Sequence, residues 1–416
     1  MTRSLRSAVL LFIVSPLLLG FDNEILHRFV PGPGLHFAQT AVEAVGDVDG
    51  NGIGDFVIGD YGHTNPGAFR NGRAYLYLAH RDPLRFERIV LEGTTDRGLF
   101  GKEIAPMGDL DDDGFADFVV TSENQRMVAV YFGRPQPPYH FRLVLAPPGV
   151  RTSDAVGVGD IDGDGAEEAL VVAIFDGLLW AVSYPDAWVL DASTLFPNVI
   201  DGLGPVDFER VYSAGDVDVD GRPDFVVKAS LTVDGQYSAY GLLYRGGDLS
   251  IQDMQPSAIV PLYPESSMSF FDMDVGSDVD GDGRPEVFVV HNQHQEQGTT
   301  RVSALAYHGP GQWNVVARFG ADVPGATGYP SVVADFDADG DGHWELLYED
   351  GFTAPNLRVY DAPFVDARID ASSFLPSSHG LRPWVRIADM ANVGDVDGDG
   401  FDDLLVVYLE PWNPQA

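Results

Sequence analysis

Aspartate-rich loops of nine residues recur seven times along the chain, and their oxygen atoms are spaced to surround a cation. Each loop has a side-chain oxygen at positions 1, 3, 5 and 9, counted from its first Asp, and Gly at position 6. Oxygens at alternate positions of a tight loop converge on one point, and Gly permits the sharp turn. This hard, flexible cage suits Ca²⁺, whereas Mg²⁺ requires stricter geometry and softer metals prefer His or Cys. The spacing therefore predicts up to seven calcium sites.

The seven segments are named loops 1 to 7 and comprise residues 47–55, 109–117, 160–168, 216–224, 278–286, 337–345 and 395–403. Position 1 is Asp47, Asp109, Asp160, Asp216, Asp278, Asp337 and Asp395. Position 3 is Asp49, Asp111, Asp162, Asp218, Asp280, Asp339 and Asp397. Position 5 is Asn51, Asp113, Asp164, Asp220, Asp282, Asp341 and Asp399. Position 9 is Asp55, Asp117, Glu168, Asp224, Glu286, Glu345 and Asp403. Position 7, whose carbonyl can add a ligand, is Ile53, Phe115, Ala166, Arg222, Arg284, His343 and Phe401.

An EF-hand is excluded because its loop needs a bidentate Glu at position 12. Here position 12 is apolar or aromatic in every loop: Ile58, Val120, Val171, Val227, Val289, Tyr348 and Val406. The acid at position 9 takes over the closing role. Loop 1 has Asn51 in place of an acid, so we expect it to bind calcium more weakly than the other loops. The alternative is that each loop is an Asp-rich turn that uses its carboxylates only for local hydrogen bonds.

The elements that position these loops are short strands. The loops recur at spacings of 51 to 62 residues, which indicates one supersecondary unit per repeat. An apolar strand enters each loop and another leaves it, such as 118–121 or 225–228. Two further strands follow, at 73–79 and 86–91 in the first repeat and at 127–132 and 140–145 in the second. Four strands per repeat predict an all-β, seven-bladed β-propeller, whose ring closure removes exposed sheet edges.

The chain ends suggest how the ring closes. Arg3 and Arg6 precede an apolar stretch at 8–19, followed by Gly20, which is typical of a secretory signal peptide over 1–20. Residues 21–416 then form the propeller. Residues 24–30 resemble an outer strand and are expected to join the last blade, because the residues after loop 7 suffice for one strand but not for three.

Composition narrows the function classes. The 63 acidic and 25 basic residues give a net charge of -38, which disfavours nucleic acid and anionic lipid as partners and favours divalent cations. With 47 Gly and 28 Pro, the chain has the composition of strands joined by turns. It has no Cys and no Asn-x-Ser/Thr sequon, which favours a bacterial exported protein that is periplasmic, secreted or at the cell surface.

The pattern D-x-D-x-[DN]-G-x-x-[DE] between two strands, repeated over residues 24–409, resembles the FG-GAP/VCBS repeat family, which includes the N-terminal propeller of integrin α subunits. Phe100-Gly101 supplies an FG pair before loop 2. The resemblance implies that calcium is held structurally at one face and that partners bind at the opposite face. The connections on that face would be 61–71, 122–126, 191–207 and 291–298.

The resemblance implies a binding or adhesion module for a protein or a glycan, for which no catalytic residue is assigned. One alternative is a carbohydrate-active enzyme such as a polysaccharide lyase, because some similar propellers process polysaccharides. His291, His294 and Glu296 are the cluster that could supply an acid or base, and a solvated loop is the simpler interpretation. A purely structural surface protein is the third possibility.

Overall fold

The structure is a computed structural model, and its described part is built almost entirely of β-strands. The described residues are 11–15, 24–29, 41–125, 127–137, 140–145, 154–165, 167–173, 178–183, 199–201, 203–233, 236–247, 256–260, 273–276, 278, 281–293, 299–309, 312–319, 332–336, 345–349, 357–360 and 386–409. Within them, a single turn of 3₁₀ helix, η1 (Glu123–Gln125), accompanies the strands. The all-β prediction is confirmed.

The strands pair antiparallel in sheets that follow the chain, named here by number. Sheet 1 contains β3 (Val42–Gly46), β4 (Asp55–Asp60), β5 (Arg73–Arg81) and β6 (Leu84–Glu92). Sheet 2 contains β7 (Phe100–Pro106), β8 (Phe118–Ser122), β9 (Met127–Phe132) and β10 (His140–Leu145). Sheet 3 contains β11 (Asp154–Gly159), β12 (Glu168–Ala173) and β13 (Leu178–Ser183). The predicted bounds of β9 and β10 are confirmed, and the strands predicted at 73–79, 86–91 and 118–121 are longer than expected.

The second half of the chain repeats the pattern. Sheet 4 contains β16 (Asp207–Gly215), β17 (Asp224–Val233), β18 (Gln236–Tyr244) and β19 (Ala258–Val260). Sheet 5 contains β20 (Met273–Gly276), β21 (Glu286–Gln293), β22 (Thr299–Tyr307) and β23 (Trp313–Phe319). Sheet 6 contains β24 (Val332–Phe336), β25 (Glu345–Glu349) and β26 (Leu357–Tyr360). A short pair, β14 (Val199–Ile200) with β15 (Gly204–Pro205), lies between sheets 3 and 4 in sequence.

Sheet 7 joins the two ends of the chain. It has the order β2-β1-β28-β27, with β27 (Arg386–Asn392) and β28 (Leu404–Leu409) from the end and β1 (Leu11–Ser15) and β2 (Glu24–Phe29) from the beginning. The strand predicted at 24–30 therefore lies in this sheet but pairs with β1, and β1 pairs with β28. The apolar segment Leu11–Ser15 supplies the third strand of the sheet. It falls within the predicted signal peptide, whose removal stays a prediction.

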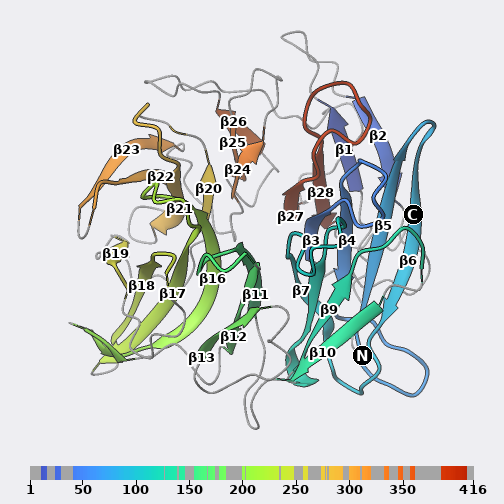
Figure 1. The fold of residues 1–416 in the computed structure, drawn as a ribbon, viewed down its shortest axis with the longest axis horizontal. Helices are drawn as coiled ribbons and strands as arrows, with labels where there is room; N and C mark the ends of the chain where they lie inside the picture. The colour runs from blue at the N-terminus through green and yellow to red at the C-terminus, as the bar shows by residue number, and fades with distance from the viewer. Residues whose placement is uncertain are drawn as a thin grey trace.

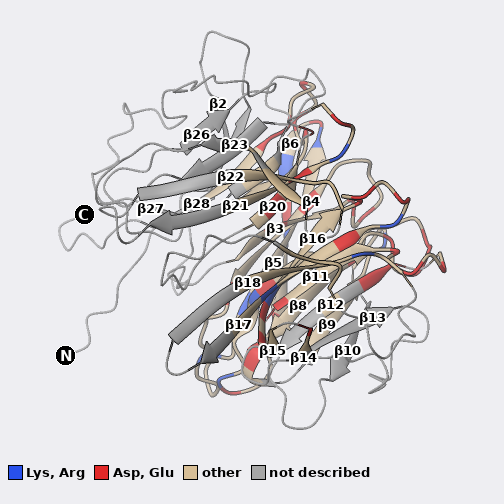
Figure 2. Cartoon of the chain, turned by 90° about the vertical axis from the view of Figure 1, so that its left-hand side faces the viewer, with Lys and Arg blue, Asp and Glu red and all other residues tan. Residues whose placement is uncertain are grey.

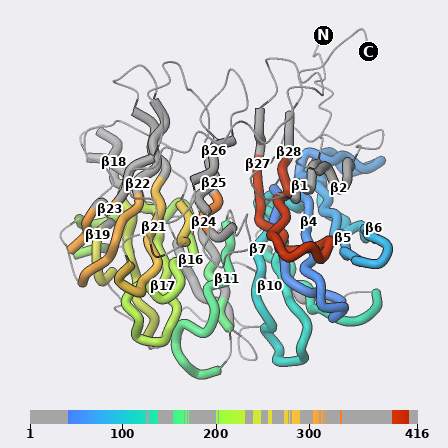
Figure 3. Tube along the Cα trace, turned by 90° about the horizontal axis from the view of Figure 1, so that it is seen from above, coloured from blue at the N-terminus to red at the C-terminus, as the bar shows by residue number. Residues whose placement is uncertain are grey.

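The first strands of sheets 1 to 6, together with β27, form the inside of the ring (Figure 1). Each contacts the next in the order β3, β7, β11, β16, β20, β24 and β27, and β27 contacts β3. Figure 3 shows the ring from its edge, with β11 between β7 and β16. Carboxylates on the inner strands accept backbone N–H groups of the following strand: Asp154 from Val211, Asp274 from Ala334, and Asp389 from Val42, at 2.8 to 3.0 Å. This ring of packed sheets is a β-propeller.

Apolar residues of the second and third strands fill the space between sheets. In sheets 1, 2 and 4, a Phe at the start of the second strand stacks on a Tyr of the third, with ring centroids 5.0 to 5.1 Å apart. These pairs are Phe56–Tyr77, Phe118–Tyr131 and Phe225–Tyr244. Their recurrence gives residue-by-residue equivalence between the three sheets.

Candidate metal centre

The predicted loops connect the inner strand of a sheet to its second strand. Loop 1 joins β3 to β4, loop 2 joins β7 to β8, and loops 3, 4, 5 and 7 occupy the same place in their own sheets. Because neighbouring strands are antiparallel, all of these loops lie at one end of the strands. Figure 2 shows acidic residues gathered in loops along one margin of the molecule.

The acid at position 1 organises loops 1 to 5 by accepting backbone hydrogen bonds. In loop 2, Asp109 accepts the N–H of Asp113 at 2.9 Å and the N–H of Gly114 at 2.7 Å. Asp47, Asp160, Asp216 and Asp278 accept the same two bonds in their loops, at 2.7 to 3.1 Å. The residue at position 6 has a positive φ, as Gly114 does at 90°, which explains why Gly is required there.

The acid at position 9 is buried and anchors the loop to its sheet. Asp117 is fully buried, and its two oxygens accept N–H groups of Leu110 at 2.9 Å and Gly133 at 2.8 Å. Asp55 and Asp224 make the equivalent pairs of bonds, to position 2 and to the residue two places beyond the stacked Tyr. The position 9 acid therefore fixes the distance between the loop and the third strand.

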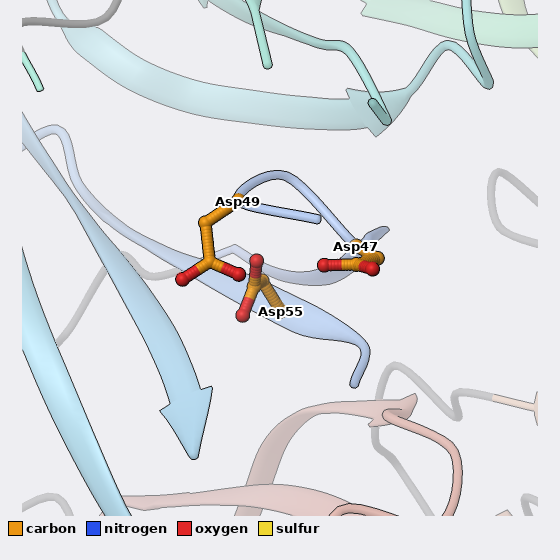
Figure 4. Close-up of side chains that lie close together, drawn as sticks. All are labelled: Asp47, Asp49 and Asp55. Carbon is orange, nitrogen blue, oxygen red and sulfur yellow. The ribbon is translucent and has the colours of Figure 1, made fainter. Parts of the chain in front are cut away.

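Carboxylates of positions 1, 3 and 9 meet in one place in four loops. One ligand atom from each member lies within 4.8 Å of the others in the sets Asp47–Asp49–Asp55, Asp109–Asp111–Asp117, Asp160–Asp162–Glu168 and Asp216–Asp218–Asp224. Figure 4 shows the first set, with the three carboxylates turned toward a common space. In loop 5 the corresponding set is Asp278–Asp282–Glu286, with position 5 as a member.

The side-chain oxygen at position 5 makes a local backbone bond in loops 1 and 2, where Asn51 and Asp113 accept the N–H of position 7 at 2.9 and 3.1 Å. The role of position 5 as a metal ligand stays a prediction. Asp280, Ala166 and the loop 6 residues Asp337, Asp339, Asp341 and His343 fall outside the described ranges. Asp397, Asp399 and Asp403 of loop 7 keep the backbone bonds of the other loops.

Burial makes the position 9 acids difficult to ionise without a cation. Desolvation, with further contributions from the other carboxylates of the loop, raises the pKa of Asp117 and Asp224 to about 7. The same causes raise the pKa of Asp55, Glu168 and Asp403 to about 8. A bound cation would favour the charged form of each acid and reverse this shift.

The donor set fits a hard divalent cation. Glu168 Oε1 and Asp403 Oδ1 are buried and have no hydrogen-bond donor among the residues that the structure describes. An orphaned buried carboxylate oxygen is costly, and a metal ion is one partner that removes the cost. All side-chain ligands are oxygens, as Ca²⁺ prefers.

The opposite end of sheet 1 holds two loops bound to each other. Phe69, in the β4–β5 connection, donates its N–H to Asp96 Oδ1 at 2.7 Å and accepts the N–H of Arg97 at 2.7 Å. Asn71 is fully buried and donates to the carbonyl of Gly93 at 2.6 Å. The two bound loops, residues 61–72 and 93–99, are called the platform below. Phe69 is 56% exposed, so the platform presents an aromatic ring to solvent.

The sequence analysis missed a group of ion pairs in which at least one partner is on an inner strand. Lys102 contacts Glu123 at 2.7 Å, and Lys228, which is 4% exposed, contacts Glu209 at 3.2 Å. Arg210 lies 3.9 Å from Glu103 and 3.8 Å from Asp154. The sequence held one signal that could have pointed to these ion pairs: Lys102 and Lys228 are the only lysines in it. Of the histidine cluster considered above, His294 and Glu296 lie beyond the described part, and the side chain of His291 is not described.

No helix among the described residues is both long enough and apolar enough to cross a membrane.

Residues 109–171 and 278–348 match the FG-GAP-like repeat, and these segments contain loops 2, 3, 5 and 6. Integrin alpha-IIb of Homo sapiens is 41% identical over 85 residues, which cover 19% of this chain and 8% of that protein. Integrin alpha-PS2 of Drosophila melanogaster is 31% identical over 143 residues, covering 29% of this chain and 10% of that protein. The chain therefore matches about a tenth of the length of these relatives. The matched repeats and the ring of sheets agree: the chain carries FG-GAP-like repeats and folds as a β-propeller.

Proposed function

We propose that this protein is an extracellular, seven-bladed propeller that binds calcium in its Asp-rich loops and serves as a binding or adhesion module for a protein partner. The observation that carries the calcium part is the recurrence of one hydrogen-bonded frame, with its buried position 9 acid and converging carboxylates, in loops 1, 2 and 4. An Asp-rich turn that needed only local hydrogen bonds would not require carboxylates to converge.

The proposed role of calcium is structural. Clusters of like charge at every loop repel one another without a cation, so binding should be coupled to folding stability. Calorimetric titration of the full chain with Ca²⁺, followed by thermal unfolding in calcium and in EGTA, tests this. We expect several bound ions and a melting temperature lower in EGTA by many degrees. An unchanged melting curve in excess EGTA would contradict the proposal.

The binding role is supported by the platform opposite the loops and by the similarity to integrin α subunits. Aromatic side chains that are exposed on a rigid support are typical anchors of protein interfaces. The test is capture of envelope or cell-surface proteins by the full chain and by Phe69→Ala. Val90→Ala is the matched control, because Val90 is an exposed apolar residue on the outer strand β6. Loss of capture is expected for the first variant and not for the second.

A further inference from the structure

Loop 4 differs from its neighbours by the close contact that its acids make with a cationic side chain of the protein itself. The residue after the stacked Tyr is buried and apolar in sheets 1 and 2, where it is Leu78 and Phe132, at 3% and 8% exposure. The equivalent residue in sheet 4 is Arg245, which follows Tyr244. The third strand of sheet 4 therefore ends with a guanidinium directly beside its loop.

Arg245 contacts the acids that the sequence assigns to the metal. Its Nε lies 2.8 Å from Asp218 Oδ2, at position 3, and its Nη2 lies 3.9 Å from Asp220 Oδ2, at position 5. The Asp218 side chain is 10% exposed and the Arg245 side chain is 43% exposed, so water reaches the guanidinium side of the contact. The guanidinium thus touches two of the four acids of loop 4.

Arginines near other loops make weaker contacts with the ligand carboxylates. Arg81, from the β5–β6 turn, approaches loop 7 through the backbone carbonyl of Asp395, while its distance to the Asp395 carboxylate is 3.6 Å. Arg284 Nε lies 4.0 Å from Asp282 in loop 5. Among these described pairs, Arg245 makes the shortest contact with a predicted ligand carboxylate.

A fixed positive charge at this distance has two consequences. It offsets the repulsion among the loop 4 acids when no metal is present. It also repels an incoming divalent ion, and it engages Asp218 Oδ2, one of the two oxygens of that carboxylate. At about 5 Å in a solvent-exposed setting, a unit charge acting on a divalent ion changes its affinity by about tenfold.

We propose that Arg245 is a built-in counter-ion of loop 4, which weakens calcium binding there and holds the loop folded when calcium is absent. This inference rests on the proposed calcium function. It revises the ranking drawn from the sequence, which makes loop 1 the weakest site because of Asn51. Loop 4 and sheet 4 would then stay folded at calcium concentrations too low to fill the other loops.

A double-mutant cycle on the full chain tests the inference. The variants are Arg245→Leu, which copies Leu78, Asp218→Asn, and the two together, with Arg88→Leu as a control that removes one charge from the exposed outer strand β6. Bound calcium is counted by equilibrium dialysis at the free concentration that half-saturates the wild-type chain, and again at saturation.

At half-saturation, the wild type and Asp218→Asn should bind the same number of ions. Arg245→Leu should bind up to one ion more, through an affinity gain of about tenfold at loop 4, and the double variant should return to the wild-type number. At saturation, Asp218→Asn should bind one ion fewer than the wild type. Arg88→Leu should change none of these numbers.

Two results would overturn the inference while leaving the calcium function intact. One is loss of bound calcium in Asp218→Asn at half-saturation equal to the loss caused by Asp111→Asn in loop 2. The other is an unchanged ion count in Arg245→Leu. Absence of calcium binding by every chain, wild type included, would contradict the proposed function itself and this inference with it.

Stability in EGTA gives a second readout. Arg245→Leu should melt about 1–2 °C below the wild type, because the loop 4 acids lose their counter-ion. Arg245→Lys, which keeps the charge, should stay close to the wild type in both assays. If Arg245→Leu does not fold, Arg245→Gln replaces it in the same cycle, and an unaltered calcium count in that variant would contradict the inference.

Discussion

The two ends of sheet 1 are held together in different ways. At the end that carries loop 1, Asp55 accepts two backbone N–H groups, and Asp117 and Asp224 repeat the arrangement in other sheets. At the opposite end, Asn71 joins two loops of unrelated sequence. The comparison teaches that a repeated sequence specifies a repeated local frame, whereas the contacts that distinguish one blade from another come from residues outside the repeat.

The largest expected effect on stability is that of Asp117→Ala, in loop 2, at the corresponding end of sheet 2. The change leaves the N–H groups of Leu110 and Gly133 without their acceptor in a buried place. Two unsatisfied buried donors cost about 3–5 kcal/mol of unfolding free energy. The loss, measured by denaturant unfolding, should be larger in calcium than in EGTA, because the variant also loses a ligand.

Asp117→Asn is the matched control, since its amide oxygen can still accept one of the two bonds. It should lose less stability than Asp117→Ala. Equal losses in calcium and in EGTA for both variants would mean that Asp117 anchors the loop without serving a metal.

At the opposite end, Asn71→Ala should destabilise the protein by about 2–3 kcal/mol. Asn71 accepts the N–H of Asn65 at 2.9 Å and donates to the carbonyls of Gly72 and Gly93. Since no predicted metal ligand takes part, the loss should be the same in calcium and in EGTA. A calcium-dependent loss would break the distinction between the two ends.

The sequence predicted what is local. The nine-residue frame depends on Asp and Gly at fixed spacing, so loop 2 and the strands β9 and β10 could be placed from the residues alone. The contact between Arg245 and loop 4 depends on the register of β17 with β18, which brings residues about 25 positions apart together. The pairing of β1 with β28 joins opposite ends of the chain, and no spacing rule predicts it.

The unfolding free energy should also depend on pH through Glu103, which is on the inner strand β7 and away from both ends of sheet 1. Burial, with smaller contributions from nearby Asp154 and Asp389, raises the pKa of Glu103 to about 8 against the opposing effects of Arg210 and Lys102. The folded protein then keeps a proton that the unfolded chain releases near pH 4.5. Stability from this group is therefore fully present below that pH and is lost as the pH rises toward 8.

Glu103→Gln should remove this decline in unfolding free energy. We expect the decline to be about 1–2 kcal/mol, because the Glu103 side chain is one quarter exposed and water screens part of the effect. The measurement is unfolding free energy between pH 5 and 8 in saturating calcium, so that the loop acids are held by metal. The same decline in the variant as in the wild type would assign it to other groups.

The smallest effect separates loop 4 from the other loops. Position 4 has a positive φ in the six loops whose position 4 the structure describes. It is Val219 at φ 58° in loop 4, and Gly50, Asp112, Gly163, Gly281 or Gly398 in the other five. A β-branched residue is strained there, and at 58% exposure its side chain gains little from packing. Val219→Gly should raise the unfolding free energy by up to about 1 kcal/mol, the relief of strain being reduced by the greater chain entropy of Gly. Val219→Asn should also stabilise, since Asn tolerates this conformation. A loss of stability in both variants would show that the Val219 side chain makes a stabilising contact that outweighs the backbone strain. Loop 4 would then differ from loop 2 by this contact as well as by Arg245.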